Sequence, residues 1–373
     1  MKIKYIFWDD DTGYGISAKQ LIRSLLNLGI QVFPVNLKIK SKYKGEYVIP
    51  DTASRQEPYD LVLIHTSPYY TARFIEPGKV NIAYCTWETT VMPGQWVEQL
   101  NKCDLIFVPS YFNQVCFQKS GITKPIKILP HISEFLGASE NAVLDRQKTT
   151  GFTFYSIGMW TNRKNNWALI QAFSNAFTHN EPVELLIKTS KKDYTRPAFD
   201  LFRKFGFAYY NNLMNNQHIK DCLQKDSRIK IITDHWSYQQ IKDLHVQGDC
   251  YVSLTKSEGW GLGAYEAAWF GKPVIITGFG GQLDYLNEDL ATLLPYDLIK
   301  IKDPVWSEYN SQQQEWAQVD MTAASQAMRA VFQSKNKYKM QGQALQQFVK
   351  LKFNEQEIIK SFQQDIHTYF GIR

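Results

Sequence analysis

Residues 249–281 read DCYVSLTKSEGWGLGAYEAAWFGKPVIITGFGG, and this stretch decides the fold class. It begins with a short apolar run, 250–254, which predicts a buried strand. A glycine-rich loop follows at 257–261, and a helical pattern at 262–270 ends in glycine and proline. A second apolar run, 273–276, then enters another glycine-rich loop. Strand, loop, helix and strand in this order predict one unit of a parallel α/β sheet.

The same stretch carries two glutamates eight positions apart, Glu258 in the loop and Glu266 in the helix. Open α/β sheets bind ligands beyond the carboxyl ends of their strands, which is where we place Glu258. Gly259, Gly261 and Gly263 would let backbone amides approach an anion at the start of a helix. A nucleotide sugar fits these features, because it offers a diphosphate, a ribose diol and sugar hydroxyls. The alternative is an ordinary solvated glutamate pair, but the glycines and the flanking buried strands favour a binding site.

Residues 257–275, SEGWGLGAYEAAWFGKPVI, resemble the E-x7-E signature of the retaining family 4 glycosyltransferases. The resemblance covers roughly residues 80 to 330 and includes four further motifs: Tyr84–Glu88 (YCTWE), Val108–Asn113 (VPSYFN), Gly158–Asn165 (GMWTNRKN) and Trp316-Ala317. It implies the GT-B fold, in which two Rossmann-like domains with doubly wound parallel sheets face each other across a cleft.

The composition bounds the class of protein. The chain has 373 residues, of which 44% are hydrophobic and 21% charged, so we expect a globular protein of two domains. We find no apolar run near ~20 residues and no signal peptide at the N-terminus, so no membrane span is expected. The five cysteines, an odd number without a C-x-x-C, indicate reduced thiols in the cytoplasm. A net charge of +6 is compatible with an anionic substrate or membrane surface; we expect no nucleic-acid partner.

The patterns of strands and helices stop and restart around a small, polar, aperiodic segment, 137–150, which predicts a linker. We therefore expect an N-terminal domain at 1–136, which would bind the acceptor, and a C-terminal domain at 151–352, which would bind the nucleotide sugar. Residues 320–370 read as three helices. The resemblance implies that the last one, within 353–373, crosses back onto the N-terminal domain.

The first predicted strand, 2–8, is followed by a polar loop. In it, Gly13-x-Gly15-x-x-Ala18 matches the dinucleotide fingerprint, but three aspartates separate the glycines from the strand. The next strand ends near Asn36 instead of an acid. An oxidoreductase that uses NADP is therefore a lesser alternative. In the family, a glycine loop at this place faces the donor phosphates and the acceptor, and Gly13 and Gly15 match it.

The aspartates at 9–11 contain the D-x-D pattern of metal-dependent sugar transferases of another fold. We favour a polar pocket lip that includes Asp11 over a metal site, because the pattern comes too early in the chain for that fold. The basic segment 38–47, KIKSKYKGEY, is interpreted as a solvated loop. Contact with an anionic membrane surface at the inner face remains open for this segment.

Arg163 and Lys164 lie between a predicted strand and a predicted helix, on the same rim as the E-x7-E loop. A helix start is electrostatically poor for cations, which favours a functional reason for this pair. Fixed cations there would stabilise the negative charge on a departing nucleoside diphosphate. Many family members carry an arginine directly after the motif's glycine, where this chain has Met159. Either Arg163 takes both roles, or Lys188 or Lys256 helps.

The remaining site assignments rest mostly on the resemblance, which implies that Glu258 holds the donor-sugar hydroxyls and Glu266 the ribose. Glu88 follows a predicted strand over 80–87, which places it toward the interdomain cleft and the acceptor. His131 is either a cleft residue, as the resemblance implies, or a purely structural histidine. Backbone around the donor is expected at the family-matching positions Gly259, Trp260, Gly261, Leu262, Gly280 and Gly281, with the base near His235.

The resemblance implies retaining, metal-independent hexosyl transfer from a nucleotide-diphosphate sugar, with a UDP-sugar favoured and no further cofactor. The acceptor would be a hydroxyl of a glycan, a lipid-linked glycan or a protein, as in cell-surface polysaccharide biosynthesis. A non-catalytic GT-B subunit that binds nucleotide sugar or a partner is the main alternative.

Overall fold

The computed structural model describes residues 1–41, 46–48, 58–133, 135, 151–196, 211–310 and 313–372. The predicted linker 137–150 lies outside the described residues, as do residues 42–45 of the basic segment. The chain divides into two compact units. The first unit is Met1–Leu136 with Leu351–Arg373, and the second unit is Gly137–Lys350.

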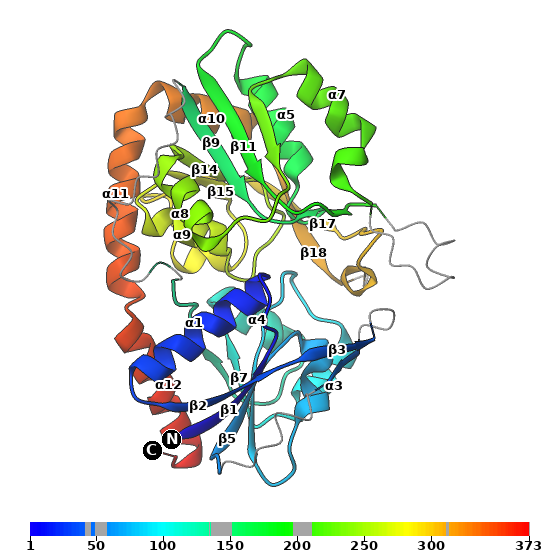
Figure 1. The fold of residues 1–373 in the computed structure, drawn as a ribbon, viewed down its shortest axis with the longest axis vertical. Helices are drawn as coiled ribbons and strands as arrows, with labels where there is room; N and C mark the ends of the chain where they lie inside the picture. Colours follow the sequence, from blue (N-terminus) through cyan, green and yellow to red (C-terminus); the bar gives the residue numbers. More distant parts are fainter. Residues whose placement is uncertain are drawn as a thin grey trace. The chain divides into compact units, whose positions relative to one another are not determined.

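The first unit is built on a parallel sheet of six strands in the order β2-β1-β5-β6-β7-β8 (Figure 1). Its strands are β1 (Lys2–Phe7), β2 (Gln31–Asn36), β5 (Leu61–His65), β6 (Val80–Tyr84), β7 (Leu105–Val108) and β8 (Ile126–Ile128). Every residue of β5 and β7 is buried, as expected of a parallel sheet covered on both faces. The helices are α1 (Gly13–Asn27), α2 (Pro68–Thr71), α3 (Gly94–Leu100), α4 (Tyr111–Lys119) and α12 (Glu355–Phe370), with a short η2 (Ala72–Phe74).

The last helix, α12, belongs to the first unit by its packing. It begins after its N-cap, Asn354, and lies beside α1 (Figure 1). Its buried Phe362 ring is 5.3 Å from the ring of Phe107 on β7. Asp365 pairs with Lys127 of β8 at 3.3 Å between Oδ1 and Nζ. The residues at the C-terminus therefore complete the core of a unit whose sheet is built from the N-terminal part of the chain.

The second unit has its own parallel sheet of six strands in the order β13-β11-β9-β14-β15-β16 (Figure 1). Its strands are β9 (Phe152–Ile157), β11 (Val183–Lys188), β13 (Ile229–Ile232), β14 (Cys250–Ser253), β15 (Val274–Thr277) and β16 (Thr292–Leu294). The helices are α5 (Asn166–Ala176), α7 (Gln217–Lys225), α8 (Tyr238–Gln247), α9 (Leu262–Trp269), α10 (Met321–Gln333) and α11 (Lys335–Lys352), with short η3 (Leu213–Asn215), η4 (Gly281–Asp284) and η5 (Ser307–Tyr309). The two sheets confirm the predicted α/β class.

The strand order of the second unit changes direction between β9 and β14. From β9 the chain moves outward to β11 and β13, and then returns to lay β14 against the other side of β9. This is a topological switch point, where loops from the carboxyl ends of two adjacent strands diverge and leave room for a ligand. In the first unit the corresponding place lies between β1 and β5.

The structure adds three small strand pairs that the sequence did not predict. They are β3 (Lys38–Ser41) with β4 (Glu46–Val48), β10 (Trp160–Thr161) with β12 (Asp193–Tyr194), and β17 (Tyr296–Lys300) with β18 (Glu315–Val319). Residues 213–224 form one helical pattern in the sequence but are divided in the structure between η3 and α7. The strand predicted to reach Trp87 ends at Tyr84. Among the described residues, no helix combines the length and the apolar character needed to cross a membrane.

Candidate functional site

Two loops leave the switch point of the second unit, one after β9 and one after β14. They start side by side because the strands are paired, with Tyr155 opposite Tyr251. The first loop carries the predicted cations Arg163 and Lys164, and the second carries Glu258. The parallel sheet therefore brings together residues that are far apart in the sequence.

Hydrogen bonds join the two loops directly. The backbone N–H of Lys256 donates to the carbonyl of Arg163 at 2.7 Å, and the Arg163 guanidinium donates to the carbonyl of Ser257 at 2.7 Å. The Asn165 amide donates to the carbonyl of Leu254 at 3.2 Å. Asn165 has a left-handed backbone with φ of 56°, which turns the chain from the loop into α5. These contacts hold both loops in one arrangement.

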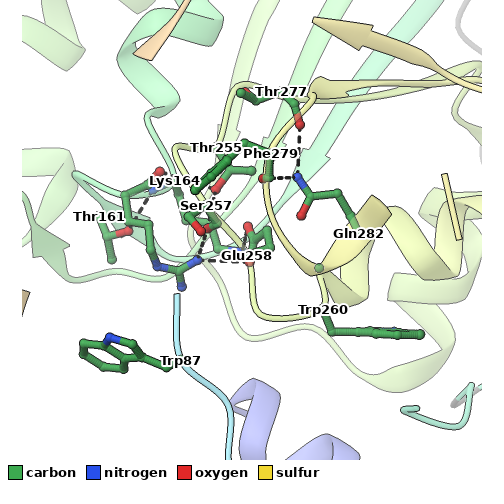
Figure 2. Close-up of polar contacts among 12 residues, drawn as sticks. Trp87, Thr161, Lys164, Thr255, Ser257, Glu258, Trp260, Thr277, Phe279 and Gln282 are labelled. Carbon is green, nitrogen blue, oxygen red and sulfur yellow. Dashed lines mark hydrogen bonds and ion pairs between the residues drawn. The ribbon is translucent and has the colours of Figure 1, made fainter. Parts of the chain in front are cut away.

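The centre of the site is an ion cluster of Arg163, Lys164 and Glu258 (Figure 2). Lys164 Nζ donates to Glu258 Oε1 at 2.6 Å, and Arg163 Nη1 donates to Oε2 at 3.0 Å. Glu258 is only 6% exposed. Burial alone would raise the pKa of Glu258, but the charges of Lys164 and Arg163 outweigh it and lower this pKa to about 2. Glu258 is therefore an anion at neutral pH, and the cluster has one positive charge in excess.

The backbone of Glu258 is fixed by the next glycine loop. Gly281 donates its N–H to the Glu258 carbonyl at 2.7 Å. Gly280 has a φ of +122°, and a Cβ at this position would come within 2.7 Å of the Glu258 oxygen and 2.9 Å of its nitrogen. Gln282 secures the loop by donating to the carbonyls of Thr277 and Phe279 at 3.0 and 2.6 Å (Figure 2). Gly280 and Gly281 thus position Glu258.

The side chain of Trp260 is part of the hydrophobic core. The ring is buried against Tyr265 and Tyr285, and in Figure 2 it is directed away from Glu258. The Tyr285 hydroxyl lies 2.9 Å from the Trp260 carbonyl and 2.8 Å from that of Gly261. Gly261, with φ of +86°, is the N-cap of α9, and Leu262 is its first helical residue. The contribution of Trp260 to the site can come only from its backbone, along with buried Gly259.

Glu266, on α9, has surroundings unlike those of Glu258. Its Oε2 lies 3.3 Å from Nε2 of His245 on α8, whose Nδ1 lies 3.0 Å from the hydroxyl of Tyr155 on β9. Burial raises the pKa of Glu266 to about 8. Burial, with the charge of Lys272, lowers the pKa of His245 to about 3. Neither His245 nor Tyr155 was predicted from the sequence, because neither lies in a motif or at a spacing that indicates a site.

Other predicted residues of the second unit lie at the same edge of the sheet. His235 is exposed in the segment between β13 and α8. Lys188, at the end of β11, places its Nζ 5.7 Å from the centre of the Trp236 ring, and burial lowers its pKa while the charge of Asp234 opposes this. Lys256 extends toward the ring of Trp316, 5.7 Å away.

The predicted glycine loop of the first unit follows β1. Asp10 Oδ1 accepts from the Thr12 N–H at 3.0 Å and from its hydroxyl at 2.5 Å, and Thr12 is the N-cap of α1. Gly15 is required because a Cβ there would overlap the Asp10 carbonyl, and Gly13 is the first residue of α1. The carboxylate of Asp11 lies 3.6 Å from Lys19 Nζ. No group of three or more His, Cys, Asp or Glu side chains in the described part of the chain could hold a metal ion.

Two further candidates also belong to the first unit. The Tyr84 hydroxyl donates to the carbonyl of Leu129 at 2.6 Å, so its oxygen accepts from His131 Nδ1 at 2.9 Å. Burial lowers the pKa of His131 to about 3, which makes it a neutral, structurally bonded histidine. Glu88 is half-buried, four residues beyond the end of β6. The structure therefore brings Arg163, Lys164, Glu258, Gly280 and Gly281 together in the second unit and keeps Gly13, Gly15, Asp11, Glu88 and His131 in the first.

No protein-family model matches the sequence, and comparison with curated proteins also gives no match. Solved structures do match. Sucrose-phosphate synthase from Thermosynechococcus elongatus superposes with a TM-score of 0.71 at 14% identity, over 100% of this chain and 99% of that one. HepE from Anabaena, in complex with UDP and glucose, gives 0.64 at 12% identity over 99% and 100%. TarM from S. aureus gives 0.56 at 12% identity, over 82% of this chain and 54% of that one.

The chain has the GT-B fold. The two six-stranded parallel sheets and their match to GT-B structures confirm the predicted architecture of each unit. The superpositions establish the fold. At identities of 11–14% they say nothing about the reaction that this chain catalyses.

Proposed function

We propose that this chain is a retaining glycosyltransferase that moves a hexose from a nucleotide-diphosphate sugar to an acceptor hydroxyl. The observation that carries the proposal is the cluster of Arg163, Lys164 and Glu258 at the switch point of the second unit. The anion is buried and the two cations are partly buried, and all three are joined to one another before any ligand binds, so little reorganisation is needed when charge develops. This is the arrangement required for a leaving group that becomes more negative as the glycosidic bond breaks.

The role of each residue follows from its charge and contacts. Glu258, held as an anion, accepts hydrogen bonds from donor-sugar hydroxyls and cannot serve as a proton donor at neutral pH. Lys164 and Arg163 stabilise the departing diphosphate. Arg163 takes the role of the arginine that the family has at the position of Met159, because its guanidinium already faces Glu258 at 3.0 Å. Glu266 accepts from the ribose hydroxyls.

The donor is proposed to be a UDP-sugar. Among the similar structures, HepE is described in complex with UDP-glucose and GtfA, the pneumococcal O-GlcNAc transferase, with UDP and GlcNAc. Acceptor binding is assigned to the first unit, with a glycan, a lipid-linked glycan or a protein as the acceptor class. The proposal needs no metal and no cofactor beyond the nucleotide sugar, and same-face attack would need no enzyme nucleophile.

The test is nucleotide release from a panel of donors: UDP-glucose, UDP-galactose, UDP-N-acetylglucosamine and GDP-mannose, each with magnesium or with EDTA. We expect release of UDP from at least one UDP-sugar, unaffected by EDTA and reduced by about 10²–10³-fold in Glu258→Gln. The matched control is Glu357→Gln, which removes the same charge from an exposed position on α12 and should act as wild type. Binding of UDP without any release, with or without added glycan acceptors, would support a non-catalytic subunit instead.

A further inference from the structure

Three buried side chains from three elements form a continuous chain in the second unit. Tyr155 comes from β9, His245 from α8 and Glu266 from α9, and their contacts are 3.0 Å from Tyr155 Oη to His245 Nδ1 and 3.3 Å from His245 Nε2 to Glu266 Oε2. Tyr155 and His245 are 0% exposed and Glu266 is 5% exposed. These hydrogen bonds therefore connect the core of the second unit to Oε2 of Glu266.

The orientation of the histidine ring is fixed by packing. Phe270 stacks on His245 with ring centroids 5.5 Å apart and an angle of 9° between the planes. Gly248 leaves the space that Tyr155 fills, because a Cβ there would overlap the Tyr155 ring. Lys272 donates to the carbonyl of Val246 at 2.8 Å, which places its charge where it disfavours protonation of His245. His245 is thus held as a neutral imidazole in one pose.

A neutral imidazole has one donor and one acceptor nitrogen, so the hydrogen bonds among Tyr155, His245 and Glu266 have two possible arrangements. When Glu266 is ionised, the Tyr155 hydroxyl donates to Nδ1 and Nε2–H donates to Oε2. When Glu266 is protonated, its proton lies on Oε2 and is donated to Nε2, while Nδ1–H donates to the Tyr155 oxygen. In both states the shared proton lies between Nε2 and Oε2, and Oε1 remains an acceptor. In the described part of the chain, Oε1 receives no hydrogen bond.

We propose that His245 is a positioning residue that keeps Oε1 of Glu266 available as a hydrogen-bond acceptor for the ribose diol of the nucleotide. The inference rests on the proposed function and adds a residue that the E-x7-E pattern does not contain. It also explains how a carboxyl group that pairs with a neutral histidine, instead of with two cations as Glu258 does, can serve as an acceptor.

The titratable neighbours make this control of the proton necessary. Glu266 is faced by His245 and by four tyrosines whose own pKa values are raised by burial: Tyr155, Tyr251, Tyr265 and Tyr285. His245 is faced by Glu266, Tyr155 and Lys272. Because burial raises the pKa of Glu266 to about 8, both of its protonation states are populated near neutral pH. Without His245, a protonated Glu266 could turn its hydroxyl toward the ligand.

The test compares UDP with 2′-deoxy-UDP by calorimetric titration. The ratio of their dissociation constants isolates the ribose hydroxyl, because both ligands carry the same ionising diphosphate. We expect 2′-deoxy-UDP to bind wild type about tenfold more weakly than UDP, because it lacks one hydrogen bond, with little change of the ratio between pH 6.5 and 9, because Oε1 accepts in both states. In His245→Phe the ratio should fall at least threefold and become pH-dependent.

Three further variants separate positioning from stability. His245→Gln keeps an N–H near the position of Nε2 and should restore part of the ratio. Tyr155→Phe removes only a hydroxyl and should give an intermediate, pH-dependent ratio. Leu244→Ala creates a cavity on the same helix and should lower the melting temperature without changing the ratio, since Leu244 is an apolar core residue.

The outcomes distinguish the inference from the function on which it rests. If UDP binds and the ratio stays at the wild-type value in both His245→Phe and Tyr155→Phe, the positioning role is overturned while the proposed function stands. If wild type binds neither ligand, the proposed function fails and the inference fails with it.

Discussion

Lys164 and Glu258 are 94 residues apart in sequence, yet Nζ of the lysine lies 2.6 Å from Oε1 of the glutamate. Arg163 occupies the other oxygen, so both oxygens of one buried carboxylate are paired with cations. The contact exists because β9 and β14 are neighbours at a switch point. Substitutions in this cluster should therefore change both the stability of the second unit and its proposed activity.

Removing the anion of this cluster should cost more stability than removing one cation. Glu258→Gln leaves two cations facing each other and should lower the free energy of unfolding by about 3–5 kcal/mol, whereas in Lys164→Met the carboxylate keeps Arg163. Urea denaturation at pH 7 measures both.

The same pair predicts a dependence on pH. The pKa of Glu258 is lowered in the folded state from 4.5 to about 2, so its stabilisation is complete above pH 4.5 and is lost as the pH falls toward 2. The stability difference between wild type and Glu258→Gln should therefore shrink over this window. Equal losses for Glu258→Gln and Lys164→Met at pH 7 would contradict the assigned charges.

Gly280→Ala should reduce activity through Glu258 without any change in a charged residue. The added Cβ would press on the backbone oxygen and nitrogen of Glu258 and displace its carboxylate. Gly29→Ala is the matched control, because Gly29 also has a positive φ, +80°, but none of the described residues comes within 4 Å of the added atom. Both variants should lose about 1–3 kcal/mol of stability from backbone strain, and only Gly280→Ala should lose UDP release as well. Similar activities in the two variants would refute the positioning of Glu258 by Gly280.

Glu266→Gln should gain stability relative to wild type as the pH rises. The pKa of Glu266 is raised from 4.5 to about 8, so between these values the folded state keeps a proton that the unfolded state has lost. The stability of wild type relative to Glu266→Gln must therefore fall from pH 5 to pH 8 and level off above it. Denaturation of both proteins at pH 5, 6.5 and 8 gives the slope. A difference that does not change with pH would show that Glu266 titrates as an ordinary glutamate.

Phe362→Ala should destabilise the first unit, although the residue lies 255 positions from its partner Phe107. The side chain is 0% exposed and its ring is 5.3 Å from that of Phe107, so truncation should cost about 3–5 kcal/mol. Gln363→Ala, at an exposed position of the same helix, should change stability by less than about 0.5 kcal/mol. Differential scanning calorimetry would reveal the loss, and an unchanged melting profile in Phe362→Ala would argue against the packing of α12 on this sheet.

Sequence periodicity could predict the sheets because both consist of short apolar strands separated by glycine-terminated helices. Ser110, Ser237 and Asn354 stand directly before helical patterns and can be recognised as N-caps from the sequence. The structure confirms these three helix starts, since capping is a local interaction. The hairpin of β17 and β18 was missed because β17 is largely exposed and has no strict alternation. Domain roles, the linker 137–150 and membrane contact at 38–47 stay predictions.

The site was predictable only where a residue belongs to a motif. Glu258, Arg163 and Lys164 follow strands directly, so the topology rule for parallel sheets places them together. His245 could not be found this way, because its contacts with Glu266 and Tyr155 depend on how α8 packs against its neighbours. Trp260 lies within the motif, but its neighbours Tyr265 and Tyr285 draw the ring into the core.

The central claim is that the cations of the second unit bind the diphosphate of a UDP-sugar, and titration of UDP into Lys164→Met tests it most directly. The control is Lys339→Met, which removes the same charge from an exposed position on α11. We predict that Lys164→Met weakens UDP binding at least about tenfold, as expected for a lost charge-assisted hydrogen bond, and that Lys339→Met leaves it unchanged. Equal affinities for UDP in wild type, Lys164→Met and Lys339→Met would contradict the account.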